Sequence, residues 1–229
     1  MNQKHIIVIG GGTAGFFAAI NSAENNPGSS VTLLEKTNKL LTKVRVSGGG
    51  RCNVTHACFD NKLLVKHYPR GEKELLNVFS RFTTEDTINW FAKRGVKLKT
   101  EADGRMFPET NTSETIVNCL MTEAERVGVK IKLGVDIEEI IRDKDNSFLL
   151  IASNGGNFHC ERLIIATGGN SKETAYNWLH KLGHTIIKPV PSLFTFNIPN
   201  HPITQLMGVS VPSARVRMGW PGTRRPADR

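Results

Sequence analysis

The sequence predicts an α/β fold: a Rossmann-like domain with a parallel sheet and an inserted antiparallel β-meander. Two observations predict this fold. A strand, a helix and a second strand follow one another at the N-terminus, with a glycine-rich turn after the first strand. Later strand-like segments are separated by short turns, which join antiparallel neighbours. The 229 residues, of which 39% are hydrophobic and 22% charged, allow one large domain with part of a second.

The N-terminal βαβ unit has the strongest pattern. Residues 5–9 are continuously apolar and end at glycine, as a buried strand does. Residues 13–25 place their apolar side chains on one broad helical face, and residues 30–34 form a second β-branched, apolar run. Because a helix connects the two strands, we expect them to be parallel with a right-handed crossover.

The rest of the chain alternates helical and strand patterns. Residues 36–70 are polar and glycine-rich with weak periodicity, and they are predicted to be mostly loop. Further helices are predicted over residues 84–94, 112–127 and 171–182. Further strands are predicted over residues 129–133, 136–142, 148–153 and 158–166, the last three as the meander. Prolines accumulate after Lys188, which predicts a dinucleotide-binding domain over residues 1–190 and the start of a second domain over residues 191–229.

The segment Gly10-Gly-Gly12-Thr-Ala-Gly15 has the G-x-G-x-x-G form between a predicted strand and a predicted helix. In this motif the first glycine permits the tight turn, the second lets a pyrophosphate approach, and the third lets helix and strand pack closely. Glu35 ends the second strand 20 positions after Gly15, where an acid can accept hydrogen bonds from ribose hydroxyls. Glycines alone would also suit a plain turn, but with Glu35 they favour dinucleotide binding.

Two further glycine-rich segments are candidate ligand contacts. In Ser47-Gly-Gly-Gly-Arg-Cys-Asn53, a ligand could touch the main chain while Arg51 and Asn53 supply charge and hydrogen bonds. A flexible surface loop is the alternative. The apolar run from Leu163 ends in Thr167-Gly-Gly169, where a strand end could meet a cofactor or simply turn into a helix.

These motifs resemble the BaiN-type, aminoacetone-oxidase-like family of bacterial NAD(P)/FAD-dependent oxidoreductases. The resemblance rests on the first motif with Glu35, on S-G-G-G-R-C-N-V-T from Ser47, on G-R-M-F-P from Gly104 and on A-T-G-G from Ala166, and it runs from residue 4 to about residue 211. It implies a flavoprotein with FAD as cofactor and NAD(P)H as reductant, acting on an unidentified small molecule by hydride or electron transfer.

The resemblance also implies where FAD binds. The ADP half is expected at Gly10, Gly12, Thr13, Ala14, Gly15, Glu35 and Lys36, with the backbone near Ile137 facing adenine. The flavin end is expected at Gly49, Gly50, Arg51, Cys52 and Asn53, and the pyrophosphate side at Thr167, Gly168 and Gly169. No side chain stands out as a catalytic acid or base, and Cys52 is interpreted as a buried or loop thiol.

The family's members are much longer than this chain. We therefore expect a chain that stops early in an inserted second domain, lacks the returning segment of the FAD domain and ends in an atypical basic tail. A non-catalytic FAD-binding remnant is accordingly one alternative function. A tRNA-associated flavoprotein is the other, suggested by a net charge of 30 − 21 = +9.

Charge, hydropathy and cysteine spacing limit the kinds of partner and the compartment that the sequence predicts. The last fifteen residues carry +4 of the net charge, so a nucleic-acid partner is not favoured. No apolar run is long enough to cross a membrane, and the four cysteines include no C-x-x-C pair, so a reduced cytoplasmic protein is expected. His180 and His184 are separated by a helix-ending glycine, and no metal site is predicted. The oligomeric state is left open.

Overall fold

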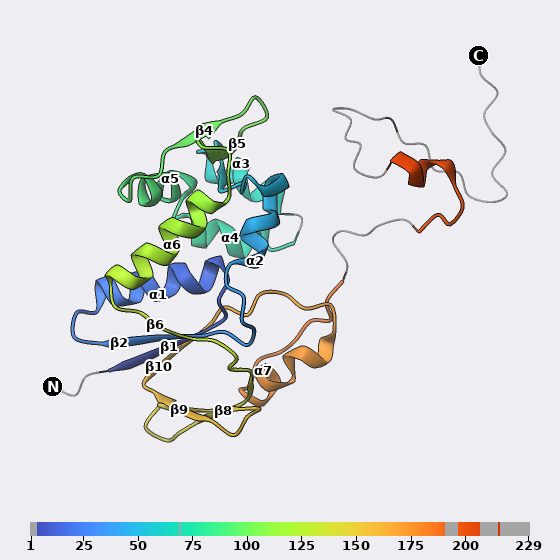
Figure 1. Cartoon of the computed structure of the whole chain (residues 1–229). Helices are drawn as coiled ribbons and strands as arrows, with labels where there is room; N and C mark the ends of the chain where they lie inside the picture. The colour runs from blue at the N-terminus through green and yellow to red at the C-terminus, as the bar shows by residue number, and fades with distance from the viewer. Residues whose placement is uncertain (1–3, 69, 191–196, 207–214, 216–229) are drawn as a thin grey trace, which may run out of the picture. The chain divides into compact units, whose positions relative to one another are not determined.

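The computed structural model describes residues 4–68, 70–190, 197–206 and 215 (Figure 1). The chain divides into two compact units, Met1–Pro189 and Val190–Arg229. In the second unit the described residues include one short 3₁₀ helix, η4 (Pro202–Leu206). Most of the predicted basic tail lies outside the described residues. Everything below concerns the first unit.

A four-stranded parallel sheet forms the centre of the first unit. Its strand order is β10 (Arg162–Ile165), β1 (His5–Ile9), β2 (Ser30–Leu34) and β6 (Lys130–Lys132). All three pairings are parallel, and α1 (Thr13–Asn25) connects β1 to β2. The predicted parallel βαβ unit is confirmed.

Alternate residues of β1 face two different cores. Ile6 and Val8 pack with buried side chains of α1 and α6 (Glu114–Arg126). Ile7 and Ile9 pack on the opposite side with a cluster that includes Leu150. Figure 1 shows α1 and α6 on one side of the sheet and β8 and β9 on the other. Because both faces of the sheet are covered, successive residues of its central strand are apolar instead of alternating with polar ones.

The second core is closed by the predicted meander. Strands β7 (Ile137–Arg142), β8 (Phe148–Ala152) and β9 (Asn157–Cys160) form an antiparallel sheet. The single strand predicted over residues 158–166 is wrong, because the chain changes sheets at Glu161. Residues before it pair with β8, while β10 after it pairs with β1. No glycine, proline or other turn residue marks the change, so the sequence does not reveal the break.

The prediction of mostly loop over residues 36–70 is also wrong. The segment contains α2 (Thr42–Val46), η1 (Ser47–Gly50), β3 (Thr55–His56), α3 (Asn61–Leu64) and η2 (Val65–His67), and α4 (Glu72–Phe79) follows. These elements are too short to show a period. β3 pairs with β5 (Arg105–Pro108), about fifty residues away, and β5 also pairs with β4 (Leu98–Thr100). Such long-range pairing leaves no local signal.

The predicted middle helices are confirmed. Helix α5 (Thr84–Ala92) begins with a capping box between Thr83 and Asp86, and α6 has its predicted apolar face. The predicted helix over residues 171–182 is split into η3 (Glu173–Tyr176) and α7 (Asn177–Lys181). None of the helices in the described residues has the length and apolar character needed to cross a membrane.

Candidate functional site

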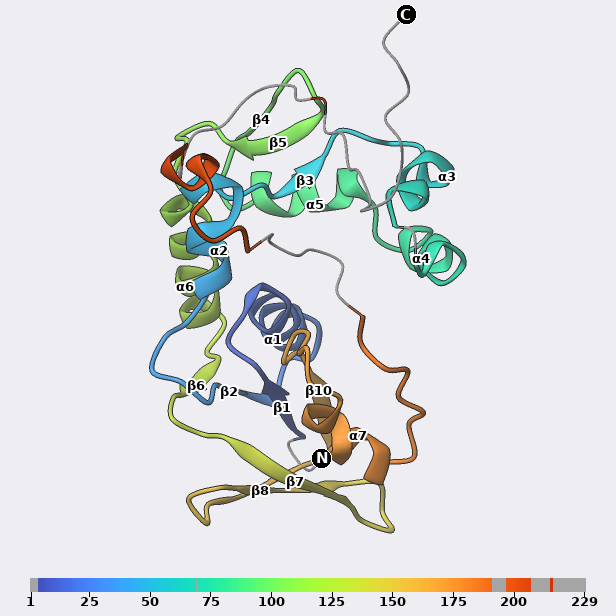
Figure 2. The same cartoon turned by 90° about the vertical axis from the view of Figure 1, so that its right-hand side faces the viewer.

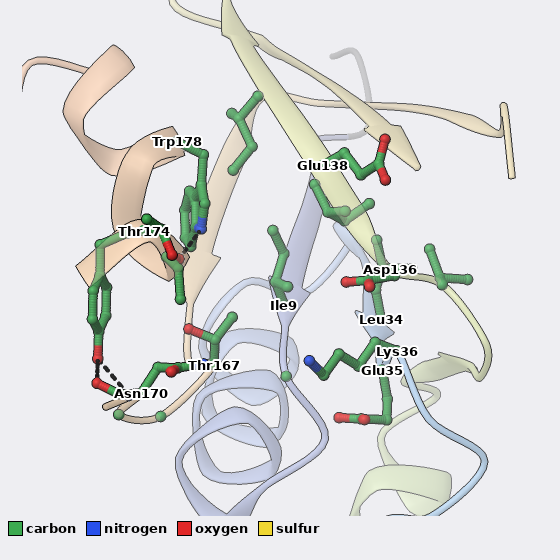
Figure 3. Close-up of a pocket in the computed structure, with 18 residues that line it drawn as sticks. Ile9, Leu34, Glu35, Lys36, Asp136, Glu138, Thr167, Asn170, Thr174 and Trp178 are labelled. Atoms are coloured by element: carbon green, nitrogen blue, oxygen red, sulfur yellow. Dashed lines mark hydrogen bonds between the residues drawn. The ribbon is translucent and has the colours of Figure 1, made fainter. Parts of the chain in front are cut away.

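A cavity of about 430 Å³ opens at the carboxyl ends of the parallel strands. It is lined by Ile9 and Gly10 at the end of β1, by Glu35 and Lys36 after β2, and by residues 167–170 after β10. Residues 135–138, at the start of β7, close the opposite side. Figure 3 shows Lys36 and Asp136 on one side of this space and Thr167 and Asn170 on the other. Ligands of open α/β sheets bind at this edge.

The glycine-rich turn has the geometry that its motif requires. Gly10 has a φ of +112°, and a Cβ there would lie 2.4 Å from the carbonyl oxygen of Ala166. A Cβ on Gly15 would lie 1.8 Å from the carbonyl oxygen of Gly10, so α1 and β1 pack at backbone contact. A Cβ on Gly12 would meet nothing within 4 Å. Gly12 thus borders open space while its neighbours are tightly packed.

The N-terminus of α1 borders that open space. Gly12 is the N-cap residue, no side chain caps the helix, and its first turn, which includes Thr13 and Ala14, carries no acidic residue. The first N–H groups of a helix have no partner within the helix, and the helix dipole adds partial positive charge. This end of α1 is therefore suited to an anionic group such as a diphosphate.

Glu35 is held in the cavity wall by three hydrogen bonds. Its Oε2 accepts from the Gly11 N–H at 2.7 Å, and its Oε1 accepts from the N–H and the hydroxyl of Thr37 at 2.9 and 2.8 Å. Burial alone would raise the pKa of this carboxyl, but the hydrogen bonds from Gly11 and Thr37 outweigh it and lower the pKa. Glu35 is therefore ionised at neutral pH and has acceptor capacity left for hydroxyl groups.

The wall near Ile137 is largely apolar. Ile9, Leu34, Val135, Ile140 and Trp178 line the cavity beside it. A flat ring could pack against these side chains while Lys36 and Asp136 supply polar contacts.

The second predicted motif lies apart from this cavity. Gly49, Gly50, Arg51, Cys52 and Asn53 are absent from its wall, and Cys52 and Asn53 line a second cavity instead. Gly49 has a φ of +68° and open space where a Cβ would be. The carbonyl oxygen of Gly50 accepts a hydrogen bond from the Ser113 N–H at 2.8 Å.

The side chains of this motif already have partners. Arg51 pairs with Glu101 at 2.5 Å, and its guanidinium carbon lies 4.0 Å from the Phe107 ring centroid. In its hydrogen-bonded orientation, the Asn53 amide donates to the carbonyl oxygens of Thr55 and Met106. Burial raises the pKa of the Cys52 thiol, which disfavours the reactive thiolate.

The structure also adds residues that the sequence did not indicate. Asn170 and Tyr176 line the first cavity, and the Tyr176 hydroxyl bonds to both the N–H and the carbonyl oxygen of Asn170. Lys43 of α2 brings its Nζ within 3.7 Å of the position that a Cβ on Gly168 would take. The glycines at 168 and 169 indicate from the sequence that residues 167–169 are a candidate ligand contact. Lys43 belongs to no motif, so the sequence does not indicate its position near them.

The fold and the edge of the sheet define a Rossmann-type dinucleotide-binding protein. The model of the HI0933-like protein Rossmann domain matches residues 4–217. The chain therefore belongs to the HI0933-like family of FAD-dependent oxidoreductases, in agreement with the resemblance seen in its motifs.

Curated relatives extend beyond this chain. A 3-dehydro-bile acid delta(4,6)-reductase of Clostridium scindens is 28% identical over 213 residues, which are 90% of this chain and 51% of that protein. A ribosomal RNA dihydrouridine synthase of Haemophilus influenzae is 30% identical over 216 residues, 90% of this chain and 52% of that protein. The chain thus spans about half the length of these relatives.

Solved structures support the fold. A 3-ketosteroid-delta4-(5alpha)-dehydrogenase from Rhodococcus jostii RHA1 matches with a TM-score of 0.55 and 18% identity, over 73% of this chain and 46% of that one. The THI4 protein of Thermovibrio ammonificans matches with a TM-score of 0.51 and 12% identity, over 80% of this chain and 64% of that one.

Alanine substitutions at two glycines of the turn should differ in their effect on stability, because one glycine is tightly packed and the other borders open space. Gly15→Ala should destabilise the protein by about 3 kcal/mol, because its methyl group would overlap the Gly10 carbonyl. Gly12→Ala, whose methyl group would meet nothing, should stay within about 1 kcal/mol of the parent. Urea unfolding curves measure both. Equal losses in the two variants would contradict the close crossing of α1 and β1.

The hydrogen bonds of Glu35 predict a pH-dependent contribution to stability. Because the folded-state pKa is lowered, this contribution is present above the ordinary carboxyl pKa and is lost as the pH falls through the folded value. Glu35→Gln should therefore cost about 0.5–1 kcal/mol at pH 7 and less at pH 3. Unfolding at both pH values tests this, with exposed Glu125→Gln as the control. A deficit that grew on acidification would refute it.

Proposed function

We propose that this chain binds FAD at the edge of its parallel sheet and forms the flavin-binding part of a reductase. The observation that carries the proposal is the pairing of two features in one place. The uncapped N-terminus of α1 borders open space at Gly12, and the ionised carboxylate of Glu35 stands beside the same turn. An anion site next to an acceptor for hydroxyl groups suits a diphosphate joined to a ribose.

In this proposal Glu35 would accept hydrogen bonds from the adenosine ribose, the apolar wall at Ile137 would pack against adenine, and the turn at Gly12 with the α1 N-terminus would hold the diphosphate. Residues 167–169 would border the far side of the cofactor. Residues 49–53 lie outside this cavity and would face the flavin end. When bound, FAD supplies hydride transfer, and the protein supplies orientation and electrostatics.

The names of the relatives support a reaction class. One is a delta(4,6)-reductase and the others are dihydrouridine synthases. Both names describe the saturation of a ring carbon–carbon double bond conjugated with a carbonyl group. We therefore propose this chemistry for this protein, acting on a small molecule. Overall, a hydride from NAD(P)H and a proton add across the double bond, and NAD(P)⁺ is released.

Flavin binding is the first test. The purified chain should be yellow, or take up added FAD, and release FAD identified by chromatography. Glu35→Gln should raise the Kd for FAD about tenfold, because it replaces a charged acceptor at the ribose. Glu125→Gln on the exposed face of α6 should leave the Kd unchanged. A colourless chain that added FAD does not restore would overturn the proposal.

A ribosomal RNA substrate is the second candidate, favoured by the 30% identity to a ribosomal RNA dihydrouridine synthase and by the net charge of +9. It predicts RNA binding that weakens by about a thousandfold or more between 50 and 200 mM salt, because phosphate contacts release counterions. The small-molecule proposal predicts no such binding. Filter binding of a uridine-rich RNA at both salt concentrations separates the two.

A further inference from the structure

The loop that follows β10 borders the first cavity with several of its backbone donors free. Residues 167–170, which we call the cavity loop, all line the cavity and are exposed. Among the residues that the structure describes, no acceptor takes a hydrogen bond from the N–H groups of residues 167–169. Backbone N–H groups are strong donors that need a partner. These three are therefore available to a ligand in the cavity.

One end of the cavity loop is fixed by the parallel sheet. The Ala166 N–H donates to the carbonyl oxygen of Ile9 at 2.8 Å, and a Cβ on Gly10 would lie 3.1 Å from the Cα of Thr167. The chain then passes through Gly168, which has a φ of +74°. Glycine is conformationally permissive, so the two glycines of the loop do not hold one conformation by themselves.

The other end of the cavity loop is held by Tyr176. Its hydroxyl accepts a hydrogen bond from the Asn170 N–H at 2.5 Å and donates one to the Asn170 carbonyl oxygen at 3.0 Å. Figure 3 shows both bonds as dashed lines on the side of the cavity that holds Thr167 and Thr174. A phenol hydroxyl both donates and accepts, so the two bonds form together. They fix both backbone polar groups of Asn170.

Tyr176 belongs to a segment that is itself anchored. It ends η3 and leads into α7, where Trp178 packs against the core that Ile7 and Ile9 share with β8. The Lys181 Nζ of α7 lies 3.4 Å from the Glu139 Oε1 of β7. Figures 1 and 2 show α7 on the side of the parallel sheet that carries β7 and β8. The Tyr176 hydroxyl therefore connects the cavity loop to a packed part of the first unit.

We propose that Tyr176 is a positioning residue for the cofactor. It holds the cavity loop so that the N–H groups of residues 167–169 stay available to the diphosphate of FAD. A loop that is already held in one conformation loses less conformational entropy when a ligand binds, so its affinity is higher. The inference rests on the proposed function, which supplies the ligand, and adds a residue that lies outside every sequence motif.

Tyr176→Phe tests the proposal, because it removes the hydroxyl and keeps the ring. In calorimetry on the full chain, the Kd values of FAD and ADP should rise at least about fivefold, since both ligands carry the diphosphate. The Kd of adenosine should stay within about twofold of the parent value. Tyr68→Phe is the same change at the other tyrosine of the chain, outside the first cavity, and should alter none of the three. Thermal melting verifies that both variants fold.

The three ligands distinguish positioning of the loop from general damage to the cavity. Equal weakening of adenosine and ADP would mean that Tyr176→Phe disturbs the whole cavity, and unchanged ADP binding would mean that the loop does not need the hydroxyl. Either result would overturn the inference. A parent chain that binds ADP and not FAD would overturn the proposed function alone, because ADP still measures the role of Tyr176. A parent chain that binds neither would overturn both.

Hydrogen exchange gives a second readout that needs no ligand. In Tyr176→Phe the Asn170 N–H loses its acceptor, so its exchange should become at least about fivefold faster. The amides of β1 should keep the rates of the parent, because the sheet is untouched. Unchanged exchange at Asn170 would show that the two hydrogen bonds do not hold the cavity loop and would contradict the inference.

Discussion

The close crossing of α1 over the end of β1 is the constraint on which the site depends. The backbone at Gly15 lies so near the Gly10 carbonyl that no side chain fits between them, and the space between Gly10 and Ala166 is also too small for a Cβ. Three segments, the ends of β1 and β10 and the start of α1, therefore converge within backbone contact. Close-packed interiors do not adjust to an added methyl group without displacement. The same contact places the N-terminus of α1 at the sheet edge beside Glu35.

The elements that could be predicted from the sequence are those whose pattern is local. The apolar run of strand β1 and the helical period of α1 are both visible in the sequence, and a motif with a known turn separates them, so their boundaries follow from residues 5–25 alone. The turns between β7, β8 and β9 are also local signals. The break at Glu161 could not be predicted, because no turn residue separates the two strands and only their partners in two different sheets distinguish them.

The same limit applies to the candidate site. Glu35 and residues 167–169 end strands of the parallel sheet, so their meeting at one edge follows from the topology alone. The sequence makes Arg51 a candidate contact for a cofactor. The structure pairs it with Glu101, which lies fifty residues away outside any motif, so the sequence does not predict this ion pair. The Tyr176 hydroxyl that holds Asn170 belongs to a segment whose helical pattern says nothing about a loop contact. Contacts of this kind, between segments far apart in the sequence, are recognised only in the folded structure.

The two cavities offer a ligand different surroundings. At the sheet edge, an ionised carboxylate and a helix N-terminus can replace water as hydrogen-bond partners of hydroxyl and anionic groups. The second cavity has the opposite character, because an aromatic wall around Trp90 takes the place of the carboxylates and Lys43 is the charged side chain in its lining. Lys43 also approaches Gly168, which lines the first cavity, so a change at this one side chain should be felt in both cavities.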